Sequence, residues 1–505
     1  MNFIDRENSK DVISCEKYHA LFVYGKDGGI SVSAEETDGT LLFKLPNITA
    51  RDLGDAEFKK DYGLEYALYG GAMANGIASS DMVIALGKAG FMGSYGAGGM
   101  PTETVAAEID KIKNALSGKP YMINMLSNRD TAAEMKLAKL LIEKNVPAVE
   151  ASAYIVPSEA LLLYRLKGIK EDENGNIVIP RKIIAKVSRE EVLEKFVSPP
   201  EAGAVASLVK AGLLTENEAK LASRVPVADD ITVEADSGGH TDGRPLVSML
   251  PALIALADRV QSKYGYAKKV RVGAGGGIGT GRSCLAAFQM GAAYVVTGSV
   301  NQACAEAGTS EHVKKILTET SMADVTMAPC ADMFEMGAKV EVIKKGTMYP
   351  QNAQKLYEYY TKYPSFEAIP APERDKIEKR ILKNTFSSVW QSTKEYFAKV
   401  DPSKIAKAEA DAKLKMALVF RWYLGSSSRW AVKGDESRKL DMQIWCGQAM
   451  GAFNLWTRGT PLEARENRLV ADVNGAIIKS GAYHYMRTLL LTLGVSEASL
   501  AEDII

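Results

Sequence analysis

The sequence is poor in cysteine and histidine, the residues from which many metal and redox sites are built. Its 505 residues include four histidines and five cysteines, and no two cysteines form a CxxC pair. An odd number of isolated cysteines argues against a zinc site or a disulfide framework. No cluster of histidine, cysteine and carboxylate residues has metal-ligand spacing along the chain, so we expect no metal. Unpaired thiols fit a reducing compartment, and we expect a cytoplasmic protein.

Long apolar runs and an excess of one charge are also missing. No stretch of about 18 apolar residues exists, so we expect no membrane span. The first residues, MNFIDRENSK, have no apolar segment of the kind found in secretory signals. Lys plus Arg and Asp plus Glu both total 62. This balance gives no support for a nucleic-acid or anionic-membrane partner.

Between residues 65 and 300 short apolar strands alternate with helical patterns. Eight strand-and-helix units over about 240 residues match the size of a (β/α)8 TIM barrel. A doubly wound open sheet shows the same alternation and is the structural alternative. Polar and glycine residues follow most of the strands, which favours the barrel because barrel active sites lie at those strand ends. The expected strand regions are 64–76, 91–96, 121–126, 148–155, 182–188, 231–235, 270–273 and 293–297.

Three further segments flank or interrupt this alternation. Residues 1–60 are a lead-in with short strands at 20–24 and 30–33, and residues 61–349 form the barrel. Residues 189–228 hold helical patterns before strand six, which we interpret as a helical insertion on the site side, with a lid as one option. Residues 350–505 form a helical C-terminal region that contains all five tryptophans. Long helices are expected there at 374–400 and 406–420.

Glycine-rich turns follow the last three expected strands. They are Asp236-Ser-Gly-Gly-His240, Gly273-Ala-Gly-Gly-Gly-Ile278 and Thr297-Gly-Ser299. Glycines at strand ends let backbone N–H groups approach a phosphate, so the turns predict a phosphate-bearing cofactor. Tight turns without a ligand are the alternative. The run 276–283 nearly matches a P-loop, but Arg282 replaces the lysine, and the GxGxxG pattern of a Rossmann site is absent.

Four polar residues at strand ends are candidates for chemistry. His240 lies between Asp236 and Asp242, and nearby carboxylates would favour its protonated form and suit it to donate a proton. The alternative is a hydrogen-bonded structural histidine. Lys186 ends an apolar strand, where it could face a reduced, anionic cofactor ring or form an ion pair within the barrel. Asn75 and Asn124 could bind a heterocycle or a phosphate, or cap a turn.

The motifs around these residues resemble a known family. Glu234-Ala-Asp-Ser-Gly-Gly-His240, followed by Gly-Gly-Gly-Ile and Thr-Gly-Ser, resembles the nitronate monooxygenase superfamily of FMN-dependent TIM barrels. Longer segments resemble the PfaD family, the enoyl reductases of polyunsaturated fatty acid synthases and of polyketide synthases with trans-acting domains. These segments are 233–242, 297–304, 331–335, 416–425 and 443–454. The resemblance covers nearly the whole chain.

The resemblance implies FMN as cofactor, NADPH or NADH as reductant, and His240 as the catalytic residue. In nitronate oxidation the matching histidine is a base, whereas in a reductase it could protonate, orient the thioester carbonyl or shape the pocket. The implied cofactor-binding residues are Gly71, Ala72, Met73, Asn75, Asn124, Lys186, Asp236, Ser237, Gly238, Gly239, Gly275, Gly276, Gly277, Gly298 and Ser299.

An enoyl reductase of this type would act on a 2-enoyl thioester carried by an acyl carrier protein, within a polyketide or fatty acid synthase complex. A homodimer is one option for its assembly. Arg421, Arg429, Arg438 and Arg458 are one option for a docking face for the acidic carrier protein, with a solvated helical surface as the alternative. Two other functions stay open, a nitronate or nitroalkane oxidase that uses oxygen and a non-catalytic component of a synthase.

Overall fold

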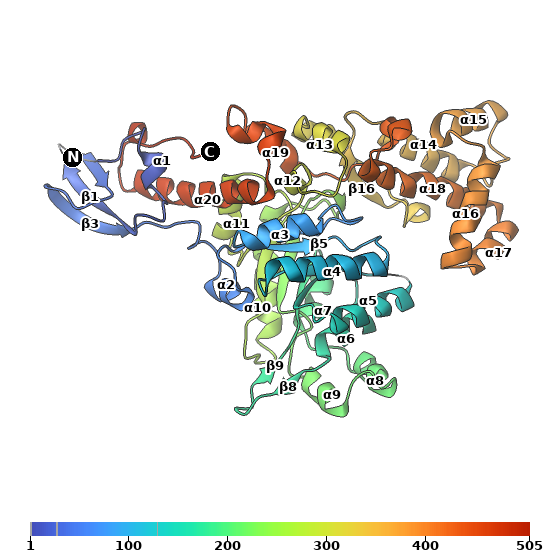
Figure 1. Ribbon diagram of the computed structural model, residues 1–505, viewed down its shortest axis with the longest axis horizontal. Coiled ribbons are helices and arrows are strands. Elements are labelled where there is room, and N and C mark those ends of the chain that lie inside the picture. Colours follow the sequence, from blue (N-terminus) through green and yellow to red (C-terminus); the bar gives the residue numbers. More distant parts are fainter. Residues whose placement is uncertain (1–2, 27–28, 129) are drawn as a thin grey trace. The chain divides into compact units, whose positions relative to one another are not determined.

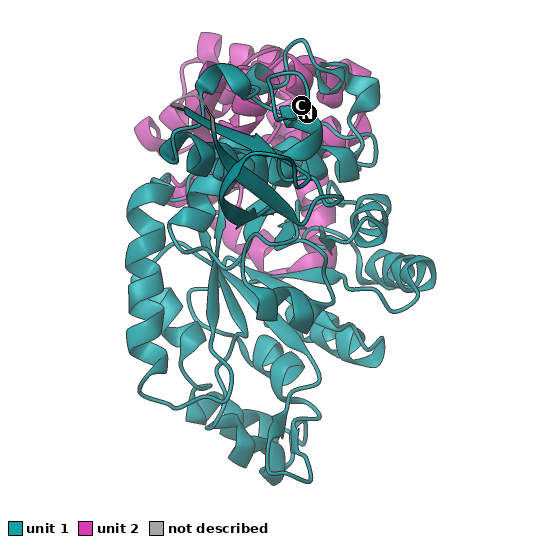
Figure 2. Ribbon diagram, turned by 90° about the vertical axis from the view of Figure 1, so that its left-hand side faces the viewer, with its two compact units in different colours: residues 1–236, 242–308, 455–505 teal, residues 237–241, 309–454 magenta. Residues whose placement is uncertain are grey.

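The computed structural model describes residues 3–26, 29–128 and 130–505, which group into two compact units (Figure 2). The barrel unit consists of Met1–Asp236, Asp242–Gly308 and Leu455–Ile505. The helical unit consists of Ser237–Thr241 and Thr309–Asn454. This division differs from the expected one, because the helical unit begins before residue 350 and the last 51 residues of the chain, Leu455–Ile505, belong to the barrel unit.

Eight parallel strands close into a barrel, which confirms the predicted (β/α)8 fold. Going round the barrel, the strands follow the order β10, β11, β13, β14, β4, β5, β6 and β7. Each strand pairs in parallel with the next one round the ring, and the short β14 pairs with both β13 and β4. The strands are β4 (Leu68–Gly70), β5 (Met92–Tyr95), β6 (Met122–Leu126), β7 (Ala148–Ser152), β10 (Lys182–Val187), β11 (Asp230–Glu234), β13 (Arg271–Gly275) and β14 (Val295–Thr297).

A helix follows each of the first seven barrel strands. At several of the helix starts a side chain accepts a backbone N–H group, as Ser79 does for Met82 and Ser158 does for Leu161, which satisfies donors that the helix leaves unpaired. The helices are α3 (Ser80–Lys88), α4 (Thr102–Leu116), α5 (Thr131–Glu143), α6 (Glu159–Leu166), α7 (Glu190–Val197), α10 (Leu246–Gln261) and α11 (Gly281–Gln289).

The eighth barrel helix comes from the far end of the sequence. Only the four-residue α12 (Ser299–Gln302) follows β14 directly. The C-terminal helix α20 (Val470–Thr492) packs against both α11 and α3, the position that the eighth helix of a barrel takes (Figure 1). Its approach to α11 is close, because a methyl group on Gly281 would overlap Ser480. The C-terminal region therefore completes the barrel.

The interior of the barrel contains hydrogen-bonded polar side chains as well as apolar ones. The hydroxyl of Thr232 lies 3.1 Å from that of Tyr69 and 3.0 Å from that of Tyr294, and all three residues are buried. At the amino ends of the strands, Arg271 donates to Asp230 at 2.6 Å. These partners satisfy the polar groups that closing the barrel removes from water.

The N-terminal residues form an antiparallel sheet of three strands in the order β2, β1, β3. Its apolar side chains, including Leu21 and Val23, form a buried cluster with Tyr483, Met486 and Leu490 of α20. Both strands expected in this region are present. The elements are α1 (Ser9–Val12), β1 (Ala20–Lys26), β2 (Gly29–Ser33), β3 (Thr40–Pro46) and, at the start of the barrel, α2 (Ala56–Tyr62).

The predicted insertion at 189–228 is helical, but its expected position on the site side of the barrel is wrong, and the option of a lid falls with it. After α7 the chain forms α8 (Ala202–Lys210) and α9 (Glu216–Ala222), both packed against α6. Glu218 of α9 accepts the N–H of Gly168, which follows α6 at the amino end of the barrel. A short hairpin, β8 (Lys170–Glu171) and β9 (Ile177–Val178), lies at the same end. Helical periodicity predicts that one face of a helix is buried, but it does not predict at which end of the barrel the helix packs.

The helical unit has a small sheet and its own apolar core. Strand β16 lies between β12 and β15. The expected helix 374–400 is interrupted near its start, because residues 377–382 are π-helical and Lys383 takes a left-handed conformation with φ of 53°. Asp411 separates two helices within the expected 406–420 and caps the second. The elements are β12 (Gly239–His240), α13 (Glu311–Thr318), β15 (Val325–Pro329), β16 (Lys339–Ile343), α14 (Tyr349–Lys362), α15 (Ala371–Lys376), the π-helix Ile377–Leu382, α16 (Phe386–Val400), α17 (Ser403–Ala410) and α18 (Ala412–Lys433); α19 (Ala449–Trp456) ends in the barrel unit.

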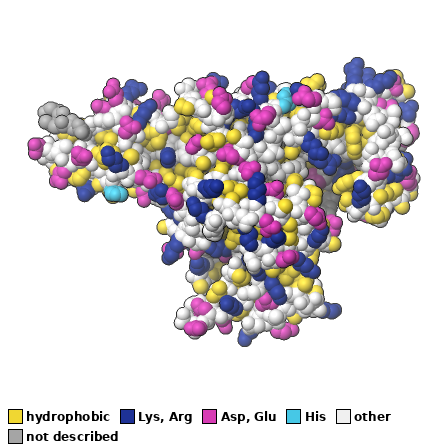
Figure 3. Space-filling view, in the orientation of Figure 1, with side chains coloured by type: hydrophobic (Ala, Val, Ile, Leu, Met, Phe, Trp, Pro, Cys, Tyr) yellow, Lys and Arg dark blue, Asp and Glu magenta, His cyan; other side chains and the backbone are white. Residues whose placement is uncertain are grey.

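Two further observations concern the length of the helices and the charge on one face. Among the described residues, every helix is too short or too polar to cross a bilayer. On the face shown in Figure 3, acidic and basic side chains are interspersed rather than gathered by sign. That face therefore presents no broad field of one charge to a polyanion.

The contact between α11 and α20 predicts opposite outcomes for two glycine substitutions. Gly281→Ala places a methyl group on Ser480 and should lower the free energy of unfolding by about 1–3 kcal/mol. Gly475→Ala, in the interior of α20, meets no atom within 4 Å and should raise it by about 0.5–1 kcal/mol through helix propensity. Chemical denaturation of both variants checks this, and equal stabilities would contradict the close contact.

Candidate functional site

The glycine-rich turns of the barrel lie at the carboxyl ends of adjacent strands. Gly275 pairs with Val296, and Thr297 pairs with Gly70. Neighbouring strands are about 4.8 Å apart, so Gly275–Gly277, Gly298–Ser299 and Gly71–Met73 emerge side by side at one rim of the barrel. The structure thus brings together three groups of residues that lie far apart in the sequence.

The first two of these turns leave room next to their backbones. Gly276 and Gly277 have φ of 90° and 74°, the left-handed region that glycine adopts without strain. A Cβ on Gly276 would lie 2.8 Å from the backbone of Ala235, so only glycine fits there. A Cβ on Gly277 or on Gly298 would meet no atom within 4 Å. Open space beside two exposed backbone turns is a suitable cradle for a phosphate.

The third turn is shaped by close backbone contacts. The N–H of Gly71 donates to the carbonyl of Thr297 at 2.9 Å, and that of Ala72 donates to Glu150 at 2.8 Å. A Cβ on Gly96 would overlap the carbonyl of Met73. Asn75 has φ of 60°, which asparagine tolerates better than most residues, and its N–H donates to Gly98 at 2.7 Å. Asn75 thus stabilises a turn, and its contact with a cofactor stays a prediction.

Lys186 is a largely enclosed cation held between two carboxylates. Its Nζ lies 2.7 Å from Oε1 of Glu234 and 3.8 Å from Oε1 of Glu150. Burial alone would lower the pKa of Lys186, yet Glu234 and Glu150 raise it above its usual value, so the side chain stays charged. The ion pair within the barrel is therefore present, and only 16% of the Lys186 side chain is exposed.

Asn124 belongs to the same polar cluster. It is buried in β6, and its Nδ2 donates to the carbonyl of Glu150 at 2.9 Å and to Oγ of Ser152 at 3.0 Å. Both amide protons are thus used by the neighbouring strand β7. The side-chain carbonyl remains as the group through which Asn124 could meet a ligand.

The motif around His240 is divided between the two units. Asp236 belongs to the barrel unit, where burial raises its pKa and its N–H donates to Arg244. Ser237, Gly238 and Gly239 belong to the helical unit. A Cβ on Gly238 would lie 2.7 Å from Cα of Cys446, so this glycine is required by packing. Cofactor binding by these three residues stays a prediction.

His240 is paired with an aspartate that the sequence did not indicate. Its Nε2 lies 3.0 Å from Oδ1 of Asp332, and Cys330 lies close to both. A hydrogen bond with Asp332, and to a smaller extent one with Cys330, raises the pKa of His240 to about 10, although burial alone would lower it. Asp242, which was expected to influence the histidine, pairs instead with Arg189 and Ser188.

Several other partners were also missed. Glu150 and Glu234 lie in otherwise apolar strands. A carboxylate in such a strand indicates a cation or hydrogen-bond donor inside the barrel, because an unpaired buried charge is unfavourable. Asn474 and Asn301 hold the end of β14: Thr297 donates to Asn474 at 2.6 Å, and Asn474 donates to Asn301 at 2.9 Å. An asparagine among the apolar residues of 470–478 was the available signal.

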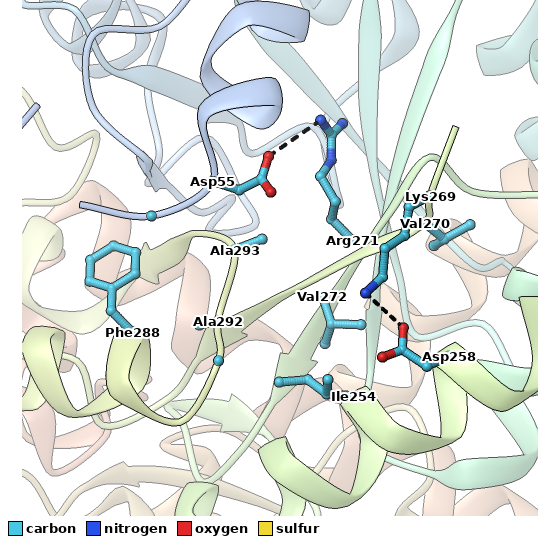
Figure 4. A pocket seen from close by; sticks show the side chains of 12 residues that line it. Asp55, Ile254, Asp258, Lys269, Val270, Arg271, Val272, Phe288, Ala292 and Ala293 are labelled. Carbon is cyan, nitrogen blue, oxygen red and sulfur yellow. Dashed lines mark ion pairs between the residues drawn. The ribbon is translucent and has the colours of Figure 1, made fainter. Parts of the chain in front are cut away.

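A cavity of about 340 Å³ lies at the opposite end of the barrel strands. Figure 4 shows its lining at the start of β13, where Lys269 pairs with Asp258 and Arg271 approaches Asp55. This lining lies at the amino ends of the strands, whereas barrel active sites lie at their carboxyl ends. Its ionic side chains already have partners, so this cavity is not the candidate site.

The Lys186 cluster predicts a large loss of stability when the cation is removed. Lys186→Met leaves Glu150 and Glu234 facing each other in the barrel and should cost about 3–5 kcal/mol of unfolding free energy. Lys136→Met is the matched control, because its pair with Glu103 is solvent-exposed and should contribute about 0–1 kcal/mol. Urea denaturation measures both variants, and a similar small loss in each would contradict the assigned ion pairs.

Comparison with known proteins agrees with this architecture. Residues 58–361 match the family described as nitronate monooxygenase. Residues 363–442 match the inserted helical domain of acyl-carrier-protein S-malonyltransferase. The crystal structure of the enoyl reductase domain of MlnA, from the macrolactin biosynthesis cluster of Bacillus amyloliquefaciens, is 40% identical with a TM-score of 0.83, covering 88% of this chain and 99% of that one.

Curated relatives are longer proteins. One polyunsaturated fatty acid synthase protein of Thraustochytrium sp. is 47% identical over 443 residues, which are 86% of this chain and 30% of that protein. Polyketide biosynthesis protein PksE of Bacillus subtilis is 44% identical over 437 residues, 86% of this chain and 57% of that protein. The chain therefore spans less than two thirds of either relative. By its matched domain and these similarities, the chain belongs to the nitronate monooxygenase family, as a PfaD-like member.

Proposed function

We propose that this chain is an FMN-dependent, NAD(P)H-consuming enoyl reductase that acts in trans on 2-enoyl thioesters. The observation that carries the proposal is the similarity to the MlnA enoyl reductase domain, at 40% identity over 99% of that domain. Membership of a flavin-dependent family supports a flavin at the barrel rim. When bound, FMN would supply the hydride chemistry, taking hydride from NAD(P)H and giving it to the β-carbon of the enoyl thioester.

The residues at the rim fit an FMN molecule. Gly276, Gly277 and Gly298 offer open space beside backbone turns, where N–H groups and the hydroxyl of Ser299 would hold the phosphate. Lys186 would place a fixed positive charge toward the ring, which suits a cofactor that becomes anionic when reduced. Glu150 fixes the Ala72 turn and Lys186 at the same time, so phosphate and ring subsites would share one support.

His240 would supply the proton that the α-carbon takes up. It stands two residues before Asp242, which returns the chain to the barrel unit. Asp332 would act as a positioning residue, because its hydrogen bond keeps the imidazole protonated and fixes its orientation. Half of the histidine side chain is exposed, so proton exchange with water between turnovers is available.

The enoyl thioester would arrive on an acyl carrier protein of a polyketide or fatty acid synthase, since the curated relatives are synthase proteins. Two arginines suggested as its docking face are already engaged within the helical unit. Arg421 pairs with Glu335 at 2.9 Å, and Arg438 stacks on Trp430 at 4.4 Å. Docking of a carrier protein would therefore depend on Arg429, Arg458 or other basic residues.

The second candidate is a nitronate oxidase that uses oxygen, and the matched family's name favours it. The enoyl reductase is preferred because the more similar solved structure is a reductase domain. A non-catalytic synthase component would turn over neither enoyl thioesters nor nitronates. Reduction of an enoyl thioester in the absence of oxygen, without turnover of nitronates, separates these functions.

The proposed phosphate cradle can be blocked without disturbing the fold. In Gly277→Asn, asparagine tolerates the left-handed backbone, and its side chain projects into the open space. We expect FMN affinity to fall at least about tenfold, a free-energy change of about 1.4 kcal/mol, because the phosphate loses its place. Quenching of flavin fluorescence on titration measures this. Gly63→Asn makes the same change at a left-handed helix end with no atom within 4 Å, and it should bind FMN like the parent chain. Equal affinity in both variants would contradict the cradle.

The His240–Asp332 pair predicts a shift in the pH profile of turnover. A proton donor is active below its pKa, so activity should fall as the pH rises through the raised pKa of His240. Asp332→Asn removes the carboxylate that favours the charged imidazole, and the fall should move to lower pH. His240→Gln should keep bound FMN and lose most turnover. NADPH oxidation with crotonyl thioester across the pH range measures these effects, and a profile unchanged in Asp332→Asn would exclude the pair.

A further inference from the structure

Three side chains of types that can bind metal ions converge in the helical unit, although His240 is far in sequence from the other two. The ligand atoms of His240, Cys330 and Asp332 all lie within 4.8 Å of one another. We propose that these residues form a three-ligand site for a divalent cation of the zinc class, in which the ion replaces the proton shared by His240 and Asp332. Binding of the ion does not depend on the proposed function, whereas its inhibitory effect rests on it.

The sheet of the helical unit fixes the geometry of this site. His240 in β12 pairs with Val340 in β16, and Val340 pairs with Ala328 in β15. The ladder continues past β15, because the N–H of Cys330 donates to the carbonyl of Ala338 at 3.0 Å. Since side chains alternate along a strand, Cys330 faces the same side as Ala328 and therefore as His240. Two ligands thus stand on one face of a single sheet, and Asp332 follows two residues later.

Burial differs among the three ligands in a way that suits an incoming ion. Cys330 is 1% exposed, whereas the side chains of His240 and Asp332 are 51% and 61% exposed. The thiol is therefore held in place, and the two exposed groups can adjust by rotation. Zinc takes its ligand atoms at about 2.0–2.3 Å, which places them about 3.3–3.8 Å apart in a tetrahedron. The observed distance between Nε2 of His240 and Oδ1 of Asp332 is 3.0 Å, slightly below this range, and no two of the three ligand atoms are more than 4.8 Å apart. Small movements would therefore bring the ligand atoms to the spacing that zinc requires.

The ligand types select the class of cation. A thiolate and an imidazole prefer zinc and similar borderline metals, whereas magnesium and calcium require a shell of oxygen atoms. Three protein ligands leave a fourth position for water. The site escapes detection in the sequence because His240 and Asp332 are 92 residues apart.

Occupation of the site would change the chemistry of His240. A bound ion takes the imidazole lone pair and displaces the thiol proton of Cys330, so affinity falls as the pH is lowered. An imidazole whose Nε2 binds the metal has lost the acidic proton of the imidazolium and is a far weaker proton donor to the substrate. Under the proposed function, zinc would therefore inhibit the reductase by occupying its proton donor.

The test is a zinc titration of the FMN-loaded protein by isothermal titration calorimetry, with X-ray absorption at the zinc edge to identify ligand atoms. We expect one zinc ion per chain with one sulfur ligand. Cys330→Ser should lose the sulfur signal and bind zinc at least about tenfold more weakly. Cys284→Ser, a buried thiol of α11 outside the site, is the control and should match the parent chain. Asp332→Asn, at an exposed position, tests a second ligand in case Cys330→Ser does not fold.

Absence of saturable binding by the parent chain, or equal binding with no sulfur lost in Cys330→Ser, would overturn the site. Turnover measured at the same zinc concentrations separates the two proposals. Zinc that binds through sulfur and stops turnover supports both. Zinc that binds through sulfur while NADPH oxidation continues unchanged supports the metal site and excludes His240 as the proton donor.

Discussion

The polar residues at the carboxyl end of the barrel are arranged around the charge of Lys186. A charged ammonium group with 16% of its side chain exposed needs close carboxylates, and Glu234 and Glu150 supply them from the two strands beside β10. Glu150 also accepts the N–H of Ala72, and its backbone carbonyl accepts Asn124. One cation therefore connects β10, β11, β7 and β6 with the turn after β4.

A second constraint comes from the path of the chain around the barrel. After β14 the chain forms the helical unit before α20 takes the place of the eighth barrel helix. Asn474 of α20 then bonds to Thr297, directly before the Gly298 turn, across a sequence separation of 177 residues. The proposed phosphate cradle is thus supported by a helix from the far end of the chain.

The parts of this structure that were predictable from the sequence depend on local pattern. The alternation of strands and helices and the backbone freedom of glycine are local properties of the sequence, so the barrel and the glycine turns after β13 and β14 were predicted. The turn after β4 was implied only by the family resemblance. Partners that are distant in sequence were not. Asp332 was visible as part of a motif, but nothing in its own neighbourhood indicates that it meets His240. The predicted position of the 189–228 helices was wrong. An amphipathic pattern shows that one face of a helix is buried, but it does not show against which part of the protein that face packs.

If the rim of the barrel holds a flavin whose electrons pass to an unsaturated acyl group, the redox state of bound FMN must respond to both substrates. Anaerobic absorbance spectroscopy of the FMN-loaded protein follows that state. We expect NADPH to bleach the flavin bands and crotonyl thioester to restore them in the absence of oxygen. A protein that takes up no FMN, or a reduced flavin that only oxygen reoxidises, would contradict the proposed electron transfer.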